Sequence, residues 1–170
     1  YLRDHMFAPL GMNDIGFKIT DAMRQRLVGV HARGEDGSLA PIPFGPSVFV
    51  ATEALLRHGS AAQKTAWLPK LANGSVIGTF ALAEKPGQNA AESIAATVKD
   101  GKLSGTKLPV ADGAVAKLAI VAAKENGATG LYLVDLEGSG VEREPLEAFD
   151  PSRGAARVRF DGARCEKLAA

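Results

Sequence analysis

The spacing of apolar residues changes along the chain, from a helical period in the first 75 residues to strand-like runs after them. Met23, Leu27 and Val30 recur three and four residues apart, so they share one face of a helix. They predict a short helix over 22–32.

Two further helices are predicted before residue 75. The first runs over Pro46–His58, where the helical period is kept by Val48, Thr52, Leu55 and Leu56. The second begins at Ser60, because its hydroxyl and the Gln63 amide form a capping box in which each accepts the other's backbone N–H. This helix continues through Trp67, and Asn73–Gly74 closes it.

The residues after 75 predict short strands joined by turns. Val76–Leu82 is one expected strand. Ser93–Lys99 and Lys102–Leu108 flank Asp100–Gly101, a dipeptide that favours the tight turn of a hairpin.

Three more strands are expected further along. Lys117–Lys124 and Gly130–Leu136 are apolar runs separated by the turn residues Glu125–Gly127, and Ala155–Phe160 alternates arginine with apolar residues. Strands at spacings of roughly ten residues with glycine-rich turns are typical of an antiparallel barrel or sandwich. The predicted fold class is therefore α+β, with short helices followed by an antiparallel β-barrel or sandwich.

Prolines divide the chain into segments. Pro41, Pro43 and Pro46 fall within a few residues of one another and predict a boundary. We expect a helical and turn-rich segment over 1–44, a helical segment over 45–75 and a β-domain over 76–170. The chain begins at Tyr1 rather than Met, and we expect a fragment or a chimera of a longer protein.

Composition narrows the class of protein. Hydrophobic residues make up 46% and charged residues 23%, with a net charge of +1, so we expect a folded chain and no nucleic-acid partner. The apolar run Leu118–Ala123 is far shorter than the roughly 20 residues that cross a membrane. A single cysteine, Cys165, and three scattered histidines predict no metal site and a reducing, cytoplasmic location.

Ser104–Lys107 matches Ser-x-x-Lys, a pattern in which lysine activates a nucleophilic serine. That chemistry requires a helix, where residues three apart share a face. Here the four residues lie in a predicted hairpin arm, where the two side chains point to opposite faces. We therefore interpret them as a surface strand.

Other candidates have simpler interpretations. Arg153, Arg157 and Arg159 could form a phosphate-facing patch, but a solvated strand face is favoured. Cys165 lies in a polar C-terminal stretch and is interpreted as an incidental thiol. No catalytic set is visible from residue types and spacing alone.

A series of cues nevertheless runs in order through the second part of the chain. Its members are Glu53–Ser60, Gln63–Gly74, Thr79–Glu84, Asp100–Lys107, Val110–Gly113, Asp150–Arg153 and Val158–Phe160. Through this order and spacing, residues 45–170 resemble the acyl-CoA dehydrogenase family. The resemblance covers the end of that family's N-terminal helical domain and its middle β-domain.

The resemblance implies FAD as cofactor and an acyl-CoA as substrate. In the family, a glutamate removes the α proton of the acyl thioester, and a hydride passes from the β carbon to the flavin. The family's glutamate base and four-helix bundle follow the β-domain, so no catalytic residue is assigned in this chain. Family members usually form dimers or tetramers, which implies a homo- or hetero-oligomer.

The resemblance also implies which residues contact the flavin: Phe80, Leu82, Ala83, Asn89, Val110 and Ala111. Several positions depart from the family pattern. Ala83 replaces a threonine, Pro109–Ala111 replaces Trp-Ile-Thr, and Pro86–Ala90 replaces a Gly-Ser-Asp loop. Each lost hydrogen bond is worth about 0.5–1.5 kcal/mol, so we expect FAD affinity to fall about tenfold or more.

Residues 1–40 have a different resemblance. Tyr1–Phe17 contains Pro-Leu-Gly-Met, and Arg26–Leu27 and Glu35–Gly37 continue the likeness to serine hydrolases related to class C β-lactamases. In those enzymes the segment is structural, so it implies no active site.

These observations favour a fragment of an FAD-dependent acyl-CoA dehydrogenase with little or no turnover of its own. One alternative is a non-catalytic module that completes the flavin and acyl-CoA site of a partner subunit. A second alternative is a fragment of a β-lactamase-like hydrolase or esterase.

Overall fold

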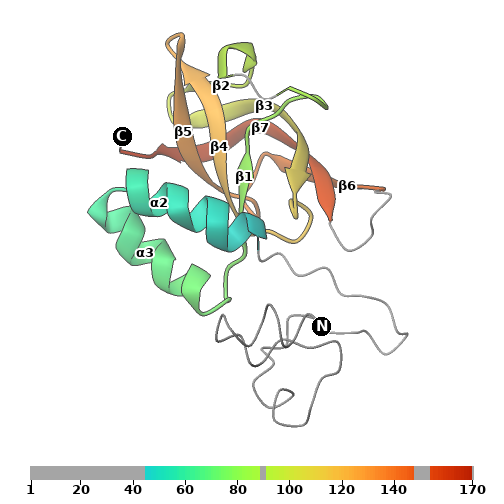
Figure 1. Ribbon diagram of the computed structural model, residues 1–170. Coiled ribbons are helices and arrows are strands. Elements are labelled where there is room, and N and C mark those ends of the chain that lie inside the picture. The colour runs from blue at the N-terminus through green and yellow to red at the C-terminus, as the bar shows by residue number, and fades with distance from the viewer. Residues whose placement is uncertain (1–44, 89–90, 148–153, 170) are drawn as a thin grey trace, which may run out of the picture. The chain divides into compact units, whose positions relative to one another are not determined.

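The computed structural model describes residues 45–88, 91–147 and 154–169, which form a helical layer beside a β-barrel (Figure 1). They belong to one compact unit, Pro41–Ala170. The helix predicted over 22–32 and the rest of segment 1–44 lie outside the described residues.

The helical layer contains three consecutive elements of the described chain. They are the π-helix η2 (Gly45–Thr52), α2 (Glu53–His58) and α3 (Ala61–Ala72). The helical prediction over Pro46–His58 is thus confirmed, but not the face that its apolar period suggests. Ser47, Ala51 and Leu55 are buried, whereas Val48 and Leu56 are exposed, because residues four apart in this segment face the sheet.

The predicted capping box at the start of α3 is confirmed. Ser60 Oγ accepts from the Gln63 N–H at 3.2 Å, and Gln63 Oε1 accepts from the Ser60 N–H at 3.0 Å. The Gln63 side-chain amide also donates to the carbonyl of Lys167 at 3.1 Å. The cap therefore fixes the helix start and also ties the helical layer to the end of the last strand.

Seven strands and the short 3-10 helix η3 (Ala91–Ser93) follow the helices in the described residues. The strands are β1 (Gly78–Ala81), β2 (Thr97–Lys99), β3 (Lys102–Ala111), β4 (Leu118–Glu125), β5 (Ala128–Asp135), β6 (Val141–Leu146) and β7 (Ala155–Lys167). β2 and β3 form the predicted hairpin, and positive φ angles of 52° at Asp100 and 71° at Gly101 give its tight turn.

The strands differ most from their predicted bounds at β2, β6 and β7, and β3 also continues past Leu108 to Ala111. The strand expected from Ser93 begins only at Thr97, because η3 precedes it. β6 was not predicted, and β7 continues past Phe160 to Lys167. Gly162, at φ 67°, lets β7 continue through a bend that reads as a turn in the sequence.

The strands close into a ring. β4 pairs with β2, β2 with β3, β3 with β7, β7 with β5, and β5 with β4 again, while β1 and β6 pair with β4 and β7. The predicted barrel is therefore confirmed. It is not purely antiparallel, because β1 and β2 both run parallel to β4. The connection from β1 to β4 contains the whole β2–β3 hairpin, which is long enough for a parallel crossover.

The barrel has an apolar interior, and a second apolar cluster lies between the barrel and the helices. β4 contributes to both. Ala119 and Val121 belong to the interior, whereas Leu118 and Ile120 pack with Leu55 of α2. The run Leu118–Ala123 is apolar throughout because both faces of this strand are covered.

Within the described part of the chain, no helix has the length and apolar character needed to cross a membrane.

Candidate functional site

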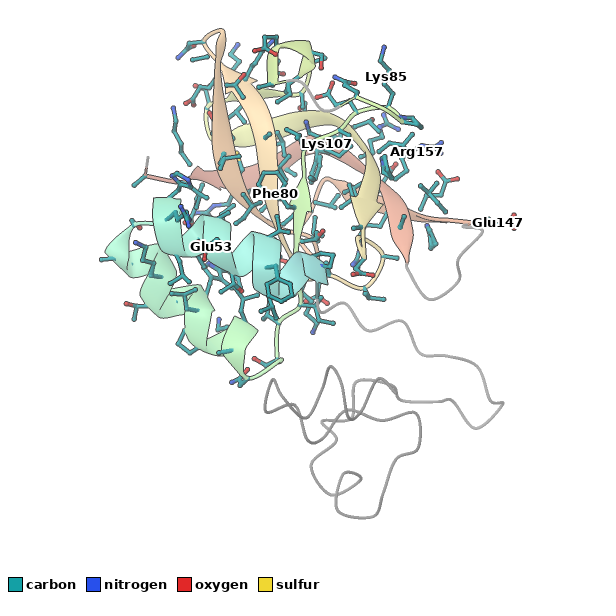
Figure 2. The ribbon with its side chains drawn as sticks, viewed as in Figure 1. Glu53, Phe80, Lys85, Lys107, Glu147 and Arg157 are labelled. Carbon is teal, nitrogen blue, oxygen red and sulfur yellow. The ribbon has the colours of Figure 1, made fainter. Side chains whose placement is uncertain are left out.

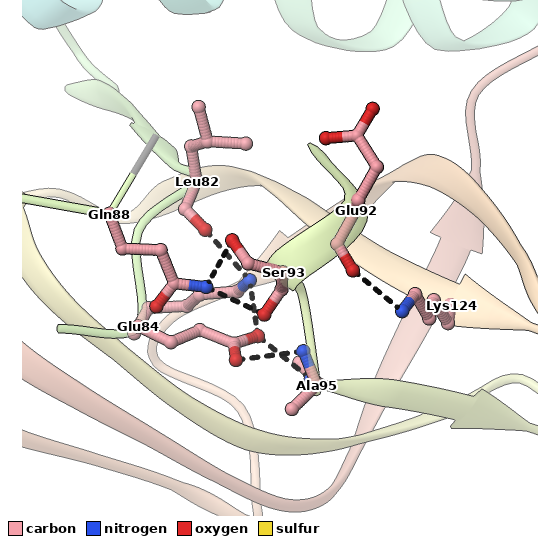
Figure 3. Close-up of polar contacts among 9 residues, drawn as sticks. Leu82, Glu84, Gln88, Glu92, Ser93, Ala95 and Lys124 are labelled. Carbon is pink, nitrogen blue, oxygen red and sulfur yellow. Dashed lines mark hydrogen bonds and ion pairs between the residues drawn. The ribbon is translucent and has the colours of Figure 1, made fainter. Parts of the chain in front are cut away.

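A charged side chain lies inside the barrel wall. Lys107 of β3 has a fully buried side chain, and Figure 2 shows it among the strands while Lys85 lies at the outside. Its Nζ donates to Glu84 Oε1 at 2.9 Å and to the Leu82 carbonyl at 3.0 Å (Figure 3). The ammonium group is therefore held by two acceptors just after the end of β1.

The Glu84 carboxylate joins a third segment to this pair. Its Oε2 accepts from the Ala95 N–H at 2.8 Å, and its Oε1 accepts from the Ala96 N–H at 2.7 Å (Figure 3). Ala95 and Ala96 directly precede β2. One carboxylate thus connects the end of β1, the approach to β2 and the middle of β3.

Burial and hydrogen bonding act on the two groups in different ways. Burial opposes ionisation of Glu84, but hydrogen bonds from Ala96, Lys107 and Ala95 outweigh it and lower the carboxyl pKa. Burial lowers the pKa of Lys107, and the Glu84 carboxylate offsets part of this effect. We interpret the pair as ionised near neutral pH, because each charge has its counter-charge within hydrogen-bond distance.

Two further hydrogen bonds hold the end of β1 beside the end of β3. The Leu108 N–H donates to the Ala83 carbonyl at 2.8 Å, and Thr79 Oγ1 donates to the Ala111 carbonyl at 2.6 Å. Ala83 therefore lies beside Leu108, and Thr79 lies beside Ala111, so the chain from β1 to Ala83 runs antiparallel alongside the end of β3. We call residues 82–83 and 109–111 the β1–β3 edge.

The structure brings most of the predicted flavin contacts to this edge. Leu82 and Ala83 are half-buried there, and Ala111 is exposed. Val110 is fully buried in the barrel interior, so only its backbone is at the edge. The Phe80 side chain packs on the helix-side cluster instead. Asn89 lies outside the described residues.

The Ser-x-x-Lys pattern does not form a nucleophile site. Ser104 is exposed, and its Oγ accepts from the Gly162 N–H at 3.2 Å, whereas Lys107 points into the barrel. The prediction that the two side chains point to opposite faces of a strand is confirmed, but the surface-strand interpretation is wrong at Lys107, whose side chain is fully buried. The hydrolase alternative then rests on residues 1–40, which lie outside the described part.

Two arginines of β7 face solvent and form pairs with glutamates of β6. Arg157 forms an ion pair with Glu144, and Arg159 lies 3.7 Å from Glu142. We call these four residues the β6–β7 ladder. The solvated-strand interpretation is confirmed for both arginines, and Arg153 lies outside the described residues.

The interpretation of Cys165 as an incidental thiol in a polar tail is wrong. Cys165 is buried in β7, among the residues of the barrel interior. Burial, together with the charge of Glu125, raises the pKa of its thiol to about 11. The thiol is therefore a neutral core side chain.

Sequence reasoning did not select Lys107 and Glu84 as partners. One indication was present, because Leu103 is apolar and period-two alternation from it places Lys107 on the inward face. A lysine at an inward position requires an acceptor. In the part of the chain with known placement, no group of three or more His, Cys, Asp or Glu residues could hold a metal ion.

Comparison with known proteins identifies relatives in sequence. No protein-family model matches the chain. The very long-chain specific acyl-CoA dehydrogenase, mitochondrial, of Homo sapiens is 30% identical over 156 residues, which cover 81% of this chain and 23% of that protein. The chain therefore spans about a quarter of the length of this relative.

Solved structures share the fold. A glutaryl-coenzyme A dehydrogenase in complex with glutaryl-CoA matches with a TM-score of 0.69 and 18% identity, covering 75% of this chain and 36% of that one. A glutaryl-CoA dehydrogenase from Mycobacterium smegmatis in complex with FADH2 matches with a TM-score of 0.60 and 28% identity, covering 70% of this chain and 32% of that one. The resemblance of residues 45–170 to the acyl-CoA dehydrogenase family is thus confirmed in sequence and in fold.

The side chains of the β1–β3 edge are compatible in chemistry with one face of a flavin ring. Leu82, Ala83, Pro109 and Ala111 present small or apolar side chains, against which a flat ring system can lie. None of these four side chains carries a hydrogen-bonding group, so polar contact is left to the backbone. The carbonyls of Leu82 and Ala83 already accept hydrogen bonds from Lys107 and Leu108.

Proposed function

We propose that the chain is a piece of an FAD-dependent acyl-CoA dehydrogenase, and that its β-domain supplies the wall against which the flavin lies. The observation that carries the proposal is the joint match, in sequence and fold, across both the helical layer and the barrel. The paired strand β3 supports this role, because it carries residues 109–111 and also holds Leu82 and Ala83 through hydrogen bonds from Lys107 and Leu108.

The residues proposed to contact FAD are those predicted from the resemblance. Leu82, Ala83 and Ala111 would do so at the edge, and Phe80 and Val110 through their backbones. Asn89, which lies outside the described residues, is the sixth proposed contact. When bound, FAD supplies the acceptor for the hydride that leaves the β carbon of the acyl thioester. The chain's own residues orient the ring and exclude water from one face of it.

We assign no catalytic base in the described part of the chain. Glu84, which lies nearest to the edge in sequence, is committed to Lys107 and two backbone N–H groups. A carboxylate with three donors and a lowered pKa is a poor proton acceptor. We therefore propose that this chain alone gives little or no turnover. We also propose an acyl-CoA substrate, assembly into a homo- or hetero-oligomer and a cytoplasmic location.

A flavin titration tests the proposal. The purified chain is titrated with FAD and followed by flavin fluorescence, and an acyl-CoA is then added with an artificial electron acceptor. We expect saturable but weak FAD binding and no acceptor reduction. Steady reduction would contradict the proposal of little or no turnover, and an absence of FAD binding would overturn the flavin-wall proposal.

A matched pair of variants locates the binding site. Ala111 and Ala128 are both exposed strand alanines, but only Ala111 lies at the edge. Ala111→Trp places a bulky ring where the flavin would lie, and we expect at least about tenfold weaker FAD binding. Ala128→Trp should leave the dissociation constant unchanged. Equal effects of the two variants would place FAD elsewhere.

A non-catalytic module that completes a partner's site is the second candidate. It is favoured by exposed apolar side chains on η2 and α2, namely Val48, Phe49, Val50 and Leu56, with Phe49 69% exposed. Co-expression with a flavin-containing partner should then give a stable yellow complex, whereas the chain alone stays colourless.

A further inference from the structure

The Lys107–Glu84 pair connects three segments that are distant in sequence. Residues 82–84 follow β1, residues 95–96 precede β2, and Lys107 lies in β3. The four hydrogen bonds between these segments are 2.7–3.0 Å long and all involve the ammonium or the carboxylate. The Leu82 carbonyl accepts from Lys107, and the Ala83 carbonyl accepts from Leu108. Neighbouring residues of β3 therefore hold both half-buried residues of the β1–β3 edge.

Stability alone is a weak reason for this arrangement. Removing two charges from water costs several kcal/mol per ion, and apolar side chains of similar size often stabilise an interior at least as well. The surrounding barrel is filled with apolar residues such as Val110, Phe160 and Ala96, so an apolar pair would suit this environment. An ion pair differs from an apolar pair in that its hydrogen bonds are directional and fix the position of the groups that they join.

We infer that Lys107 and Glu84 are positioning residues that set the place of residues 82–84 and 95–96 against β3, and so the shape of the β1–β3 edge. The link to a ligand rests on the proposed function of that edge, whereas the placement of the segments does not. Neither residue takes part in the chemistry.

Local amide hydrogen exchange tests the placement. Lys107→Met removes the ammonium and keeps a long apolar side chain. We expect exchange at the amides of Ala95, Ala96 and Leu108 to rise at least about tenfold, while the β4–β5 amides of Ile120 and Leu133 stay unchanged. No change at the first group, or an equal rise at all of these amides, would overturn the inference.

A double variant separates positioning from stability. Lys107→Met with Glu84→Gln leaves no unpaired buried charge, so we expect its thermal unfolding midpoint to recover toward that of the unmodified chain. Exchange at Ala95, Ala96 and Leu108 should nevertheless stay fast, because the ammonium donor and one of the two carboxylate acceptors are missing. Recovery of both the midpoint and the local protection would make the pair merely structural and overturn the inference. This variant also keeps the test decisive if the single variant fails to fold.

Flavin titration tests the link to the edge. Lys167→Met is the matched control, since Lys167 forms an exposed ion pair with Glu125 at 3.0 Å. In the double variant the FAD dissociation constant should rise at least about tenfold, and in the control it should not change. Loosened exchange with unchanged FAD affinity would overturn the link to the edge. If the unmodified chain binds no FAD, the proposed flavin wall fails, and the exchange result still decides the placement.

Discussion

The barrel carries two sets of opposite charges that differ in their exposure to water. Lys107 and Glu84 are 0% and 13% exposed, whereas Arg159 and Glu142 of the β6–β7 ladder are 61% and 77% exposed. Both sets join neighbouring segments of the same barrel. Water solvates the ladder charges whether or not they meet, but the buried charges depend on each other. Burial, rather than the count of ion pairs, therefore decides which pair the fold depends on.

The largest expected effect comes from removing the buried carboxylate. Glu84→Ala leaves the Lys107 ammonium buried without its counter-charge and removes the acceptor of two backbone N–H groups. We expect the free energy of unfolding to fall by about 3–5 kcal/mol, measured by urea unfolding. Glu142→Ala is the control from the ladder. A loss below about 1 kcal/mol in Glu84→Ala would mean that water reaches the pair and that the contrast fails.

The buried thiol of Cys165 on β7 gives a second test of how burial changes the chemistry of a side chain. Because the pKa of the Cys165 thiol is raised to about 11 from 9.0, its thiolate fraction at mildly alkaline pH should be about 100-fold below that of an ordinary thiol. Iodoacetamide should therefore label the folded chain at least about 100-fold more slowly than the urea-unfolded chain. Similar labelling rates in the two states would show that β7 opens readily at this position.

The loss of folding stability at acidic pH is expected to be a smaller effect. The pKa of Glu84 is lowered from its ordinary 4.5, so its contribution is fully present above that value and is lost as the pH falls through the lower pKa of the folded state. Urea midpoints measured over falling pH should decline less steeply in Glu84→Gln than in the unmodified chain. Glu125, whose carboxyl pKa is lowered by its hydrogen bond to Lys167, also contributes to this loss. Equal declines of the urea midpoint in the two proteins would show that other carboxyl groups cause the loss of stability at acidic pH.

The smallest effect is expected in the ladder. Arg159→Ala removes one exposed pair, and the free energy of unfolding should change by about 0.2–1 kcal/mol. Salt at about 1 M should remove most of the difference, because it screens exposed charges. A salt-independent loss comparable to that of Glu84→Ala would remove the distinction between the two sets of charges.

Local chemistry made much of the fold predictable. Asp100–Gly101 encodes its turn, since both residues adopt positive φ, and Ser60 with Gln63 encodes the start of α3. β6 was not predicted because three of the six residues of Val141–Leu146 are charged and one is proline, and because, among the described strands, it pairs only with β7. β7 was cut short because Asp161–Gly162 resembles a turn, whereas its continuation depends on pairing with β3 and β5.

The candidate site was predictable in composition but not in arrangement. The resemblance selected Leu82, Ala83 and Ala111, and the structure places them on two neighbouring antiparallel segments, with Ala83 beside Leu108 and Ala111 beside Thr79. The Val110 side chain points into the barrel interior and not toward the edge, because the pairing of β3 with β7 shifts register between Lys107 and Val110. Such a shift changes the facing of every later side chain and leaves no trace in local alternation.

The closed ring of strands has a consequence for the order in which a growing chain can fold. β3 pairs with β7, with Lys102 opposite Arg164. β5 pairs with the end of the same strand. Until Ala155–Lys167 leaves the ribosome, β3 and β5 both have open edges that can pair with other chains. A chaperone that shields these two edges would therefore act late in synthesis, and a stop codon before Ala155 should yield an aggregation-prone product.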